Sequence, residues 1–202
     1  MSGVTDEFLM RAVRDGDVGQ LGQLFDRYHG RLYDFLSRMT GNRVAAEDLV
    51  QDVFVRILKY RETYRDDGRF ETWVFRIARN ARADYFRRAR PDEPLADSAE
   101  DQPATVPGPA MQLEHQRDAA RLRRALVQLR EDRRELIVLA RYQGLKHEQI
   151  AELLGIEVGA VKVRLHRAIA ELRDVFHKTG DGESPCVAQT SAPTYSKTPP
   201  TH

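Results

Sequence analysis

The stretch 145–172 reads LKHEQIAELLGIEVGAVKVRLHRAIAEL and decides how the chain folds. Its small residue Ala151 is followed by Gly155 and then by the apolar Val161. This spacing is typical of two helices joined by a tight turn. The alanine lets the helices approach, the glycine accepts the turn, and the valine faces into the angle between them. The stretch therefore predicts a helix-turn-helix, whose second helix can enter the major groove of DNA.

The outer face of that second helix has the composition of a groove-binding surface. At about 100° per residue, Val161, Leu165 and Ala168 lie on the inner face. Small apolar groups on the outer face can contact thymine methyls, arginine can reach guanine edges, and lysine can contact phosphates. The candidate DNA-contacting residues are Ala160, Lys162, Val163, Arg164 and Arg167. The alternative interpretation is a three-helix bundle whose charged face is only solvated.

The same stretch contains the beginning of a metalloprotease motif that is not completed. His147 and Glu148 start an H-E-x-x-H pattern, but Ala151 stands where the second zinc-binding histidine is required. The chain has one cysteine, Cys186, and therefore cannot form a cysteine-based zinc site by itself. We expect no metal and no cofactor.

The first ninety residues predict further helices. Apolar residues recur at helical spacing over 21–39, 46–58 and 70–85, and a shorter helix is expected near 5–14. Asn42 follows Gly41 at the end of the first long segment, and Asp66-Asp67-Gly68 is a turn signal. Because no strand-like alternation occurs anywhere, we expect an all-α protein.

The segment 69–90 is rich in arginine, with seven arginines against Glu71 and Asp84. Cations next to aromatic rings and an amide are suited to single-stranded nucleic acid, because arginines follow phosphates while rings stack on bases. The side chains expected to face away from the apolar side are Arg76, Arg79, Asn80, Arg82 and Arg87, with Trp73, Phe75 and Phe86 at its boundaries. The alternative is that Trp73 belongs to the core and the arginines are solvated.

The helix over 46–58 has an unusual outer face. Asp48, Gln51, Asp52, Val55 and Lys59 point away from its core side, so that an apolar valine lies among polar residues. This composition favours a protein partner over bare solvent.

Composition divides the chain into segments. Residues 91–110 combine five prolines with five acids and no base, which indicates a flexible, acidic linker. We therefore expect a helical bundle over 1–90, a linker over 91–111, a second bundle with the helix-turn-helix over 112–177, and a disordered tail over 178–202. No apolar run approaches the roughly 20 residues of a membrane span, and the lone thiol is usual in a reducing compartment. We expect a cytoplasmic protein.

Three segments taken together resemble a bacterial sigma factor of the extracytoplasmic-function class within the sigma-70 family. They are EDLVQDVFVRIL (47–58), RFETWVFRIARNARADYFRR (69–88) and the segment from Leu126 to Leu172. The resemblance covers roughly 20–90 and 112–176. The chain differs from the family's usual pattern at four positions, Lys146, Glu157, Ala160 and Val163, which places the preferred upstream sequence in question but not the fold.

The resemblance implies a function without covalent chemistry, in which the chain directs core RNA polymerase to promoter DNA. It implies that Asp48, Gln51, Asp52 and Val55 contact the polymerase. It also implies that the −10 element is recognised and melted by Tyr64, Arg69, Trp73, Arg76, Asn80 and Arg87. The helix from Val158 would read the −35 element as a duplex. An anti-sigma protein is a further partner that we expect from this resemblance.

Two other functions remain as alternatives. A stand-alone helix-turn-helix regulator would bind a duplex palindrome as a dimer without polymerase, but the segment of arginines and aromatic residues argues against it. A hydrolase or nuclease would need a metal cluster, a phosphate-cradling glycine loop or an activated nucleophile, and the sequence offers none of these.

Overall fold

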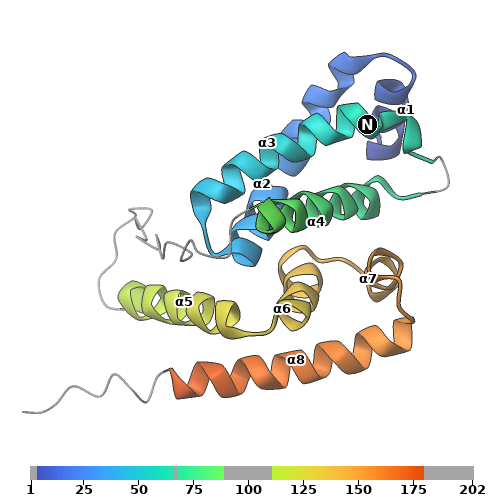
Figure 1. Cartoon of the computed structure of the whole chain (residues 1–202). Coiled ribbons are helices and arrows are strands. Elements are labelled where there is room, and N and C mark those ends of the chain that lie inside the picture. Colours follow the sequence, from blue (N-terminus) through green and yellow to red (C-terminus); the bar gives the residue numbers. More distant parts are fainter. Residues whose placement is uncertain (1–3, 66–67, 89–110, 180–202) are drawn as a thin grey trace, which may run out of the picture.

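The computed structural model describes residues 4–65, 68–88 and 111–179, and these parts of the chain contain helices and no strand. In Figure 1 the N-terminal half (residues 4–88) lies above the C-terminal half (residues 111–179). The N-terminal half contains the helices α1 (Asp6–Arg14), α2 (Leu21–Thr40), α3 (Arg43–Tyr60) and α4 (Phe70–Arg88). The C-terminal half contains α5 (Met111–Gln128), α6 (Glu131–Ile137), α7 (His147–Leu154) and α8 (Val158–Lys178). The all-α prediction is confirmed.

The long helices of the N-terminal half begin and end where the sequence signals lie. Helix α2 ends at Gly41, whose φ of 71° is the left-handed conformation that glycine adopts without strain. The next helix is capped by Asn42, whose side-chain oxygen accepts a hydrogen bond from the amide of Ala45 at 3.1 Å. The Gly41-Asn42 pair therefore sets the sharp reversal between α2 and α3.

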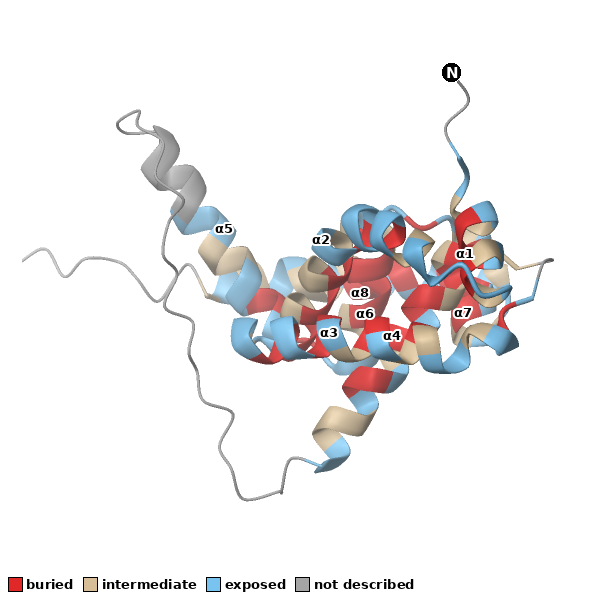
Figure 2. Cartoon of the chain, turned by 90° about the horizontal axis from the view of Figure 1, so that it is seen from above, coloured by how far each residue is buried: buried red, intermediate tan, exposed pale blue. Residues whose placement is uncertain are grey.

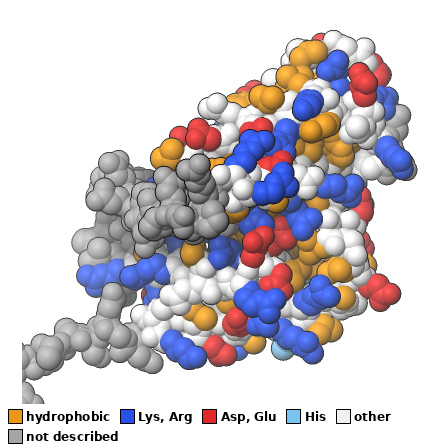
Figure 3. Space-filling view, viewed as in Figure 1, with side chains coloured by type: hydrophobic (Ala, Val, Ile, Leu, Met, Phe, Trp, Pro, Cys, Tyr) orange, Lys and Arg blue, Asp and Glu red, His pale blue; other side chains and the backbone are white. Residues whose placement is uncertain are grey.

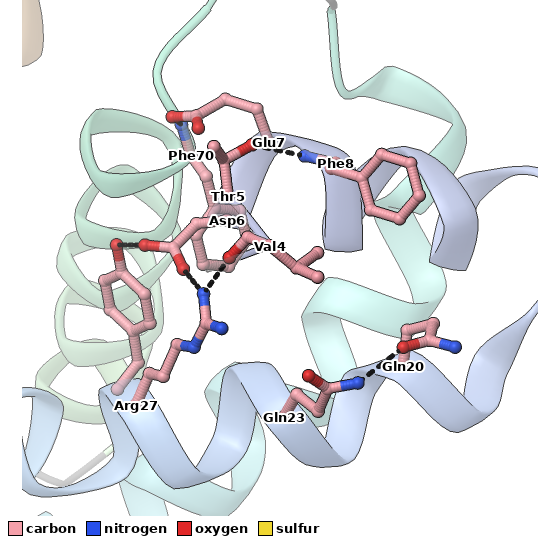
Figure 4. Close-up of polar contacts among 10 residues, drawn as sticks. Val4, Thr5, Asp6, Glu7, Phe8, Gln20, Gln23, Arg27 and Phe70 are labelled. Atoms are coloured by element: carbon pink, nitrogen blue, oxygen red, sulfur yellow. Dashed lines mark hydrogen bonds and ion pairs between the residues drawn. The ribbon is translucent and has the colours of Figure 1, made fainter. Parts of the chain in front are cut away.

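Helix α1 fixes the start of α4, as Figure 4 shows for the residues around Asp6. The Asp6 carboxylate accepts one hydrogen bond from the Tyr28 hydroxyl and one from Arg27, each at 2.6 Å. Burial, together with the hydrogen bond to Asp6, raises the pKa of the Tyr28 hydroxyl well above its usual range. Glu7 accepts a hydrogen bond from the backbone amide of Phe70 at 3.4 Å. These contacts hold the first turn of α4 against α1 and α2.

The C-terminal half has the predicted helix-turn-helix. Ala151 is buried, Gly155 ends α7 with φ of 65°, and the fully buried Val161 lies between the helices. At the start of α7 the Lys146 amide donates to the side-chain oxygen of Gln149 at 2.9 Å, so Gln149 closes this end without a capping serine. Helix α6 begins at Glu131 and continues as a π-helical turn over Val138–Tyr142.

The two halves pack directly on each other and share one hydrophobic core. Phe75 on α4 and Leu139 after α6 belong to the same cluster of buried residues. Figure 2 shows the buried residues concentrated where α4, α6 and α8 overlap. The sequence predicts two bundles but does not predict this contact between them. The predicted linker, apart from Met111, and all but the first two residues of the predicted tail (178–202) lie outside the described residues.

No helix in the described ranges is both long and apolar enough to span a bilayer. Within the same ranges, no three histidine, cysteine or acidic side chains gather into a group that could bind a metal ion.

Candidate nucleic-acid interface

Most of the residues expected at the −10 element meet around one hollow. Arg69, Trp73, Arg76 and Asn80 line a pocket of about 670 Å³ between the loop before α4 and the outer face of that helix. The three polar residues of this set are exposed, and Trp73 is half-buried. The pocket therefore combines guanidinium groups, an amide and an aromatic ring, which are the groups that hold an unstacked base and its phosphates. Arg87, the remaining residue expected at the −10 element, is exposed but does not line this pocket.

Tyr64 lines the same pocket, but it is buried where we expected an accessible contact. Its side chain is 2% exposed and packs edge-on against Trp73, with ring centroids 5.3 Å apart. Its hydroxyl donates to the carbonyl of Gly68 at 3.0 Å. The aromatic ring of Tyr64 therefore supports Trp73 and shapes the loop, and it has little surface with which to stack on a base.

Two residues of α4 that we expected on the outer face, and one that we expected at its boundary, are buried or paired. Phe75 is fully buried and packs edge-on against Phe35, with ring centroids 5.4 Å apart. Arg82 is buried and paired with Glu131, and Arg79 is paired with Glu135. The prediction that Arg79 and Arg82 face outward is wrong, because that side of α4 packs against the C-terminal half. Phe75, which we expected at the boundary of the apolar face, lies in the core against Phe35 of α2.

A polar network joins the two halves, and the sequence alone does not predict it. Arg31 on α2 donates to Glu71 at 2.6 Å, and Glu71 also accepts from Gln149 on α7 at 2.6 Å. Gln143 donates to Asp34 at 2.9 Å. In Figure 3 basic and acidic side chains gather along the seam between the halves. No local pattern marks these residues, because each partner is remote in sequence.

The outer face of α8 stands free of the rest of the molecule. Lys162, Val163, Arg164 and Arg167 are exposed, and Ala160 is half-buried. Val163 is 52% exposed although it is apolar. This face thus offers three cations around one small apolar side chain, which fits a surface that reads duplex DNA.

The expected polymerase-binding face lies on α3. Asp48 and Gln51 are exposed, and Val55 is 62% exposed. Asp52 is half-buried because it accepts a hydrogen bond from Arg56 at 2.9 Å. Arg56 also donates to Asp84 on α4 at 2.7 Å, so this face is tied to the helix beside it.

Comparison with known proteins identifies the family of this chain. Residues 24–91 match the family model for sigma-70 region 2, and residues 119–172 match the model for sigma-70 region 4. The chain is 37% identical to the RNA polymerase sigma factor CarQ of Myxococcus xanthus over 171 residues, which cover 83% of this chain and 95% of the relative. The chain belongs to the sigma-70 family.

Other relatives agree on the class of sigma-70 factor. The chain is 34% identical to the ECF RNA polymerase sigma factor RpoE of Cereibacter sphaeroides, covering 82% of this chain and 91% of that protein. It is similar, with a TM-score of 0.64 and 25% identity, to the sigma factor RpoE of Bartonella quintana in complex with the anti-sigma factor NepR. That alignment covers 78% of this chain and 96% of the other.

This sigma factor is therefore of the extracytoplasmic-function class and acts in transcription initiation, where sigma factors direct RNA polymerase to promoters. The family is not one of enzymes. A stand-alone dimeric regulator is not favoured, because both sigma regions are present in one chain.

Proposed function

We propose that three exposed surfaces, on α3, at the start of α4 and on α8, each make a separate contact during promoter opening. Helix α3 contacts core RNA polymerase through Asp48, Gln51, Asp52 and Val55. The pocket at the start of α4 holds the parted strand of the −10 element, and α8 reads the −35 element as a duplex. The observation that carries the proposal is the convergence of Arg69, Trp73, Arg76 and Asn80 on one pocket, away from the free face of α8.

The chemistry of the pocket supports a role in melting. Stacking of a base on an aromatic ring is worth about 1–3 kcal/mol, and removing a base from the duplex costs a few kcal/mol. Trp73 supplies the ring, and its half-buried position against Tyr64 fixes the plane on which a base would stack. Arg69, Arg76 and, beyond the pocket, Arg87 supply charge for phosphates. These contributions are comparable with the cost of flipping one base.

The face of α8 supports a different kind of recognition. Lys162, Arg164 and Arg167 are long cations that reach phosphates and guanine edges, whereas Ala160 and Val163 are small apolar groups that fit thymine methyls. Because the helix bearing them belongs to a helix-turn-helix, it can lie in a major groove. This face thus supplies the sequence-specific part of promoter selection.

The proposal includes two protein partners and a location. Core RNA polymerase docks on α3, where the exposed Val55 lies among polar residues. An anti-sigma protein is the second partner, by analogy with the Bartonella quintana RpoE complex. The site of action is the cytoplasm, where the polymerase and the chromosome are located.

The proposal is tested by reconstitution with core RNA polymerase on genomic promoter fragments, followed by mapping of transcript starts. The wild-type chain is expected to produce defined starts that core polymerase alone does not. Substitution of Asp48, Gln51 and Val55 by alanine should abolish co-purification with the core, while Asp174→Asn, an exposed change on α8, should not. A chain that binds a palindromic duplex as a dimer and leaves transcript starts unchanged would overturn the proposal.

A further inference from the structure

We infer that Arg56 and Asp84 are positioning residues, which hold one polymerase-contacting side chain and one DNA-contacting side chain in place. The pair bridges α3 and α4 inside the N-terminal half. Through Arg56 it orients Asp52 of the proposed polymerase face, and through Asp84 it orients Arg87, which is expected at the −10 element. The inference rests on the proposed function, which assigns those two contacts, and it adds the residues that stand behind them.

Four charged side chains form one continuous chain of hydrogen bonds across α3 and α4, which lie side by side in Figure 1. The Arg56 guanidinium donates from Nε to Oδ2 of Asp52 at 2.9 Å and from Nη1 to Oδ2 of Asp84 at 2.7 Å. The other oxygen of Asp84, Oδ1, accepts from Nη2 of Arg87 at 2.8 Å. Positive and negative groups therefore alternate, and each of the two inner residues has two partners.

Exposure to solvent increases from the middle of this chain of hydrogen bonds towards its two ends. Of the inner pair, the side chain of Arg56 is 14% exposed and that of Asp84 is 25% exposed. Of the outer pair, Asp52 is 39% exposed and Arg87 is 76% exposed. The inner residues are therefore held within the fold, whereas the outer residues can reach a partner outside the chain.

Each outer residue can make a further contact while it is held. Asp52 accepts from Arg56 at Oδ2, and a carboxylate can accept more hydrogen bonds at its second oxygen. Arg87 uses Nη2 for Asp84, and a guanidinium has four other N–H donors that can reach a phosphate. The internal bonds thus fix the orientation of both side chains without using up their capacity to bind.

The middle position favours arginine because its two partners lie on different helices. Asp52 lies one turn before Arg56 on α3, whereas Asp84 lies on α4. The planar guanidinium presents donors in several fixed directions, so that one side chain bridges both carboxylates. The hydrogen bond from Arg56 also holds the pKa of Asp84 below its ordinary value, which keeps this carboxylate charged for its bond with Arg87.

A side chain that is oriented before binding loses less conformational freedom when the complex forms. Ordering one such side chain at an interface weakens binding by roughly threefold to tenfold. Loss of Arg56 releases Asp52 directly and removes the partner that holds Asp84 against Arg87. We therefore expect a loss of about threefold in polymerase binding and a loss of similar size in promoter opening.

The first experiment is a double-mutant cycle on polymerase binding. The full chain, labelled with fluorescein at its amino terminus, is titrated with core RNA polymerase and followed by anisotropy. Arg56→Gln should weaken binding about threefold in the wild-type background but cause no further loss in the Asp52→Asn background, because Arg56 acts through Asp52. The same loss in both backgrounds would overturn the inference, because a general effect on the fold does not depend on Asp52.

A second cycle follows promoter opening. Core polymerase is kept saturating, and permanganate reactivity is measured on a promoter fragment whose transcript start has been mapped. Arg56→Gln should lower the yield of open complexes about threefold, and beside Arg87→Ala it should lower the yield no further. A loss of the same size with and without Arg87→Ala would contradict the positioning of Arg87.

Two further variants separate positioning from charge and from folding. Arg11→Gln, at an exposed position of α1, removes the same charge and should leave both readings unchanged. If it lowers them as much as Arg56→Gln does, net charge is the cause and the inference is wrong. Circular dichroism establishes that each variant is folded. Should Arg56→Gln be unfolded, Arg56→Lys replaces it, because lysine keeps the charge without the fork, and it should show the same dependence on Asp52 and Arg87.

This inference and the proposed function fail in different ways. If Asp52→Asn leaves polymerase binding unchanged and Arg87→Ala leaves promoter opening unchanged, the proposed contacts themselves are wrong. If both single changes are damaging but Arg56→Gln adds the same loss in every background, only the positioning role is wrong.

Discussion

Arg79 on α4 and Glu135 on α6 form a two-pronged ion pair across the seam between the two halves, with oxygen–nitrogen distances of 2.7 Å and 3.2 Å. The two residues are 56 positions apart in the sequence. Because Glu135 is buried, its charge depends on this partner for compensation. The pair therefore connects a helix proposed to hold parted DNA with the half of the chain that is proposed to read duplex DNA.

Removal of Arg79 should destabilise the closed arrangement. Arg79→Ala leaves the buried carboxylate of Glu135 without its hydrogen-bond donors, which we expect to lower the free energy of unfolding by about 2 kcal/mol. Arg88→Ala, at an exposed position of the same helix, should change it by less than about 0.5 kcal/mol. Urea denaturation followed by circular dichroism measures both. Equal midpoints for the two variants would show that the Arg79–Glu135 pair is not a stabilising contact.

The turn of the helix-turn-helix should require glycine at position 155, whereas the glycine at position 159 should be replaceable. Gly155 has φ of +65°, so an alanine there would be strained although there is open space around it, and we expect a loss of about 1 kcal/mol. Gly159 lies within α8 and also has open space, so Gly159→Ala should stabilise by about 0.5–1 kcal/mol. Thermal unfolding of the two variants separates these effects. A gain in stability from Gly155→Ala would contradict the left-handed conformation.

Acid should weaken the link between α3 and α4. The hydrogen bond from Arg56, with Arg87 and Arg88 also nearby, holds the pKa of Asp84 below its ordinary value of 3.8. As pH falls, the unfolded chain takes up this proton before the folded chain does. The contribution of Asp84 is therefore complete well above 3.8 and is lost as pH falls through the folded-state pKa.

Accordingly, Asp84→Asn should lower the urea midpoint of unfolding at about pH 6. The difference from the wild type should shrink as pH falls below the ordinary value of 3.8 and through the lowered folded-state pKa of Asp84. A difference that stays constant over this range would mean that the carboxylate charge does not stabilise the fold.

The outer face of α8 should affect promoter choice without affecting assembly. Arg167→Ala removes an exposed guanidinium from the proposed duplex-reading face, and loss of one base contact costs about 1–3 kcal/mol. Transcription from promoters that need the upstream element should fall by about tenfold or more, while binding to core polymerase measured by gel filtration should be unchanged. Arg173→Ala, at an exposed position near the other end of α8, is the matched control. Equal loss of promoter use and of polymerase binding would show that Arg167 belongs to a different surface.

The features that could be predicted from the sequence are those set by neighbouring residues. Ala151, Gly155 and Val161 predict the helix-turn-helix because its geometry depends on local spacing. The end of α2 at Gly41 and the cap of α3 by Asn42 are equally local. These short-range signals locate most of the helices and the exposed face of α8.

The contact between the halves could not be predicted in this way. A helical wheel separates apolar from polar faces, and by that measure Arg79 and Arg82 face solvent. The structure places a second helical half against that face, where Glu131 and Glu135 compensate the arginines. Phe75, expected at the boundary of the apolar face, lies in the core, where its ring packs against Phe35 of α2. Pairings over 49 and 56 residues leave no periodic signal in a single sequence.

The central claim, that this chain parts promoter DNA through α4 when it is bound to polymerase, is tested most directly by permanganate footprinting of unpaired thymines. On a promoter fragment with core polymerase, the wild-type chain should make thymines near the start site reactive. Trp73→Ala should remove that reactivity while polymerase is still recruited. Thymines that stay unreactive with the wild-type chain, or that react equally with Trp73→Ala, would contradict the account.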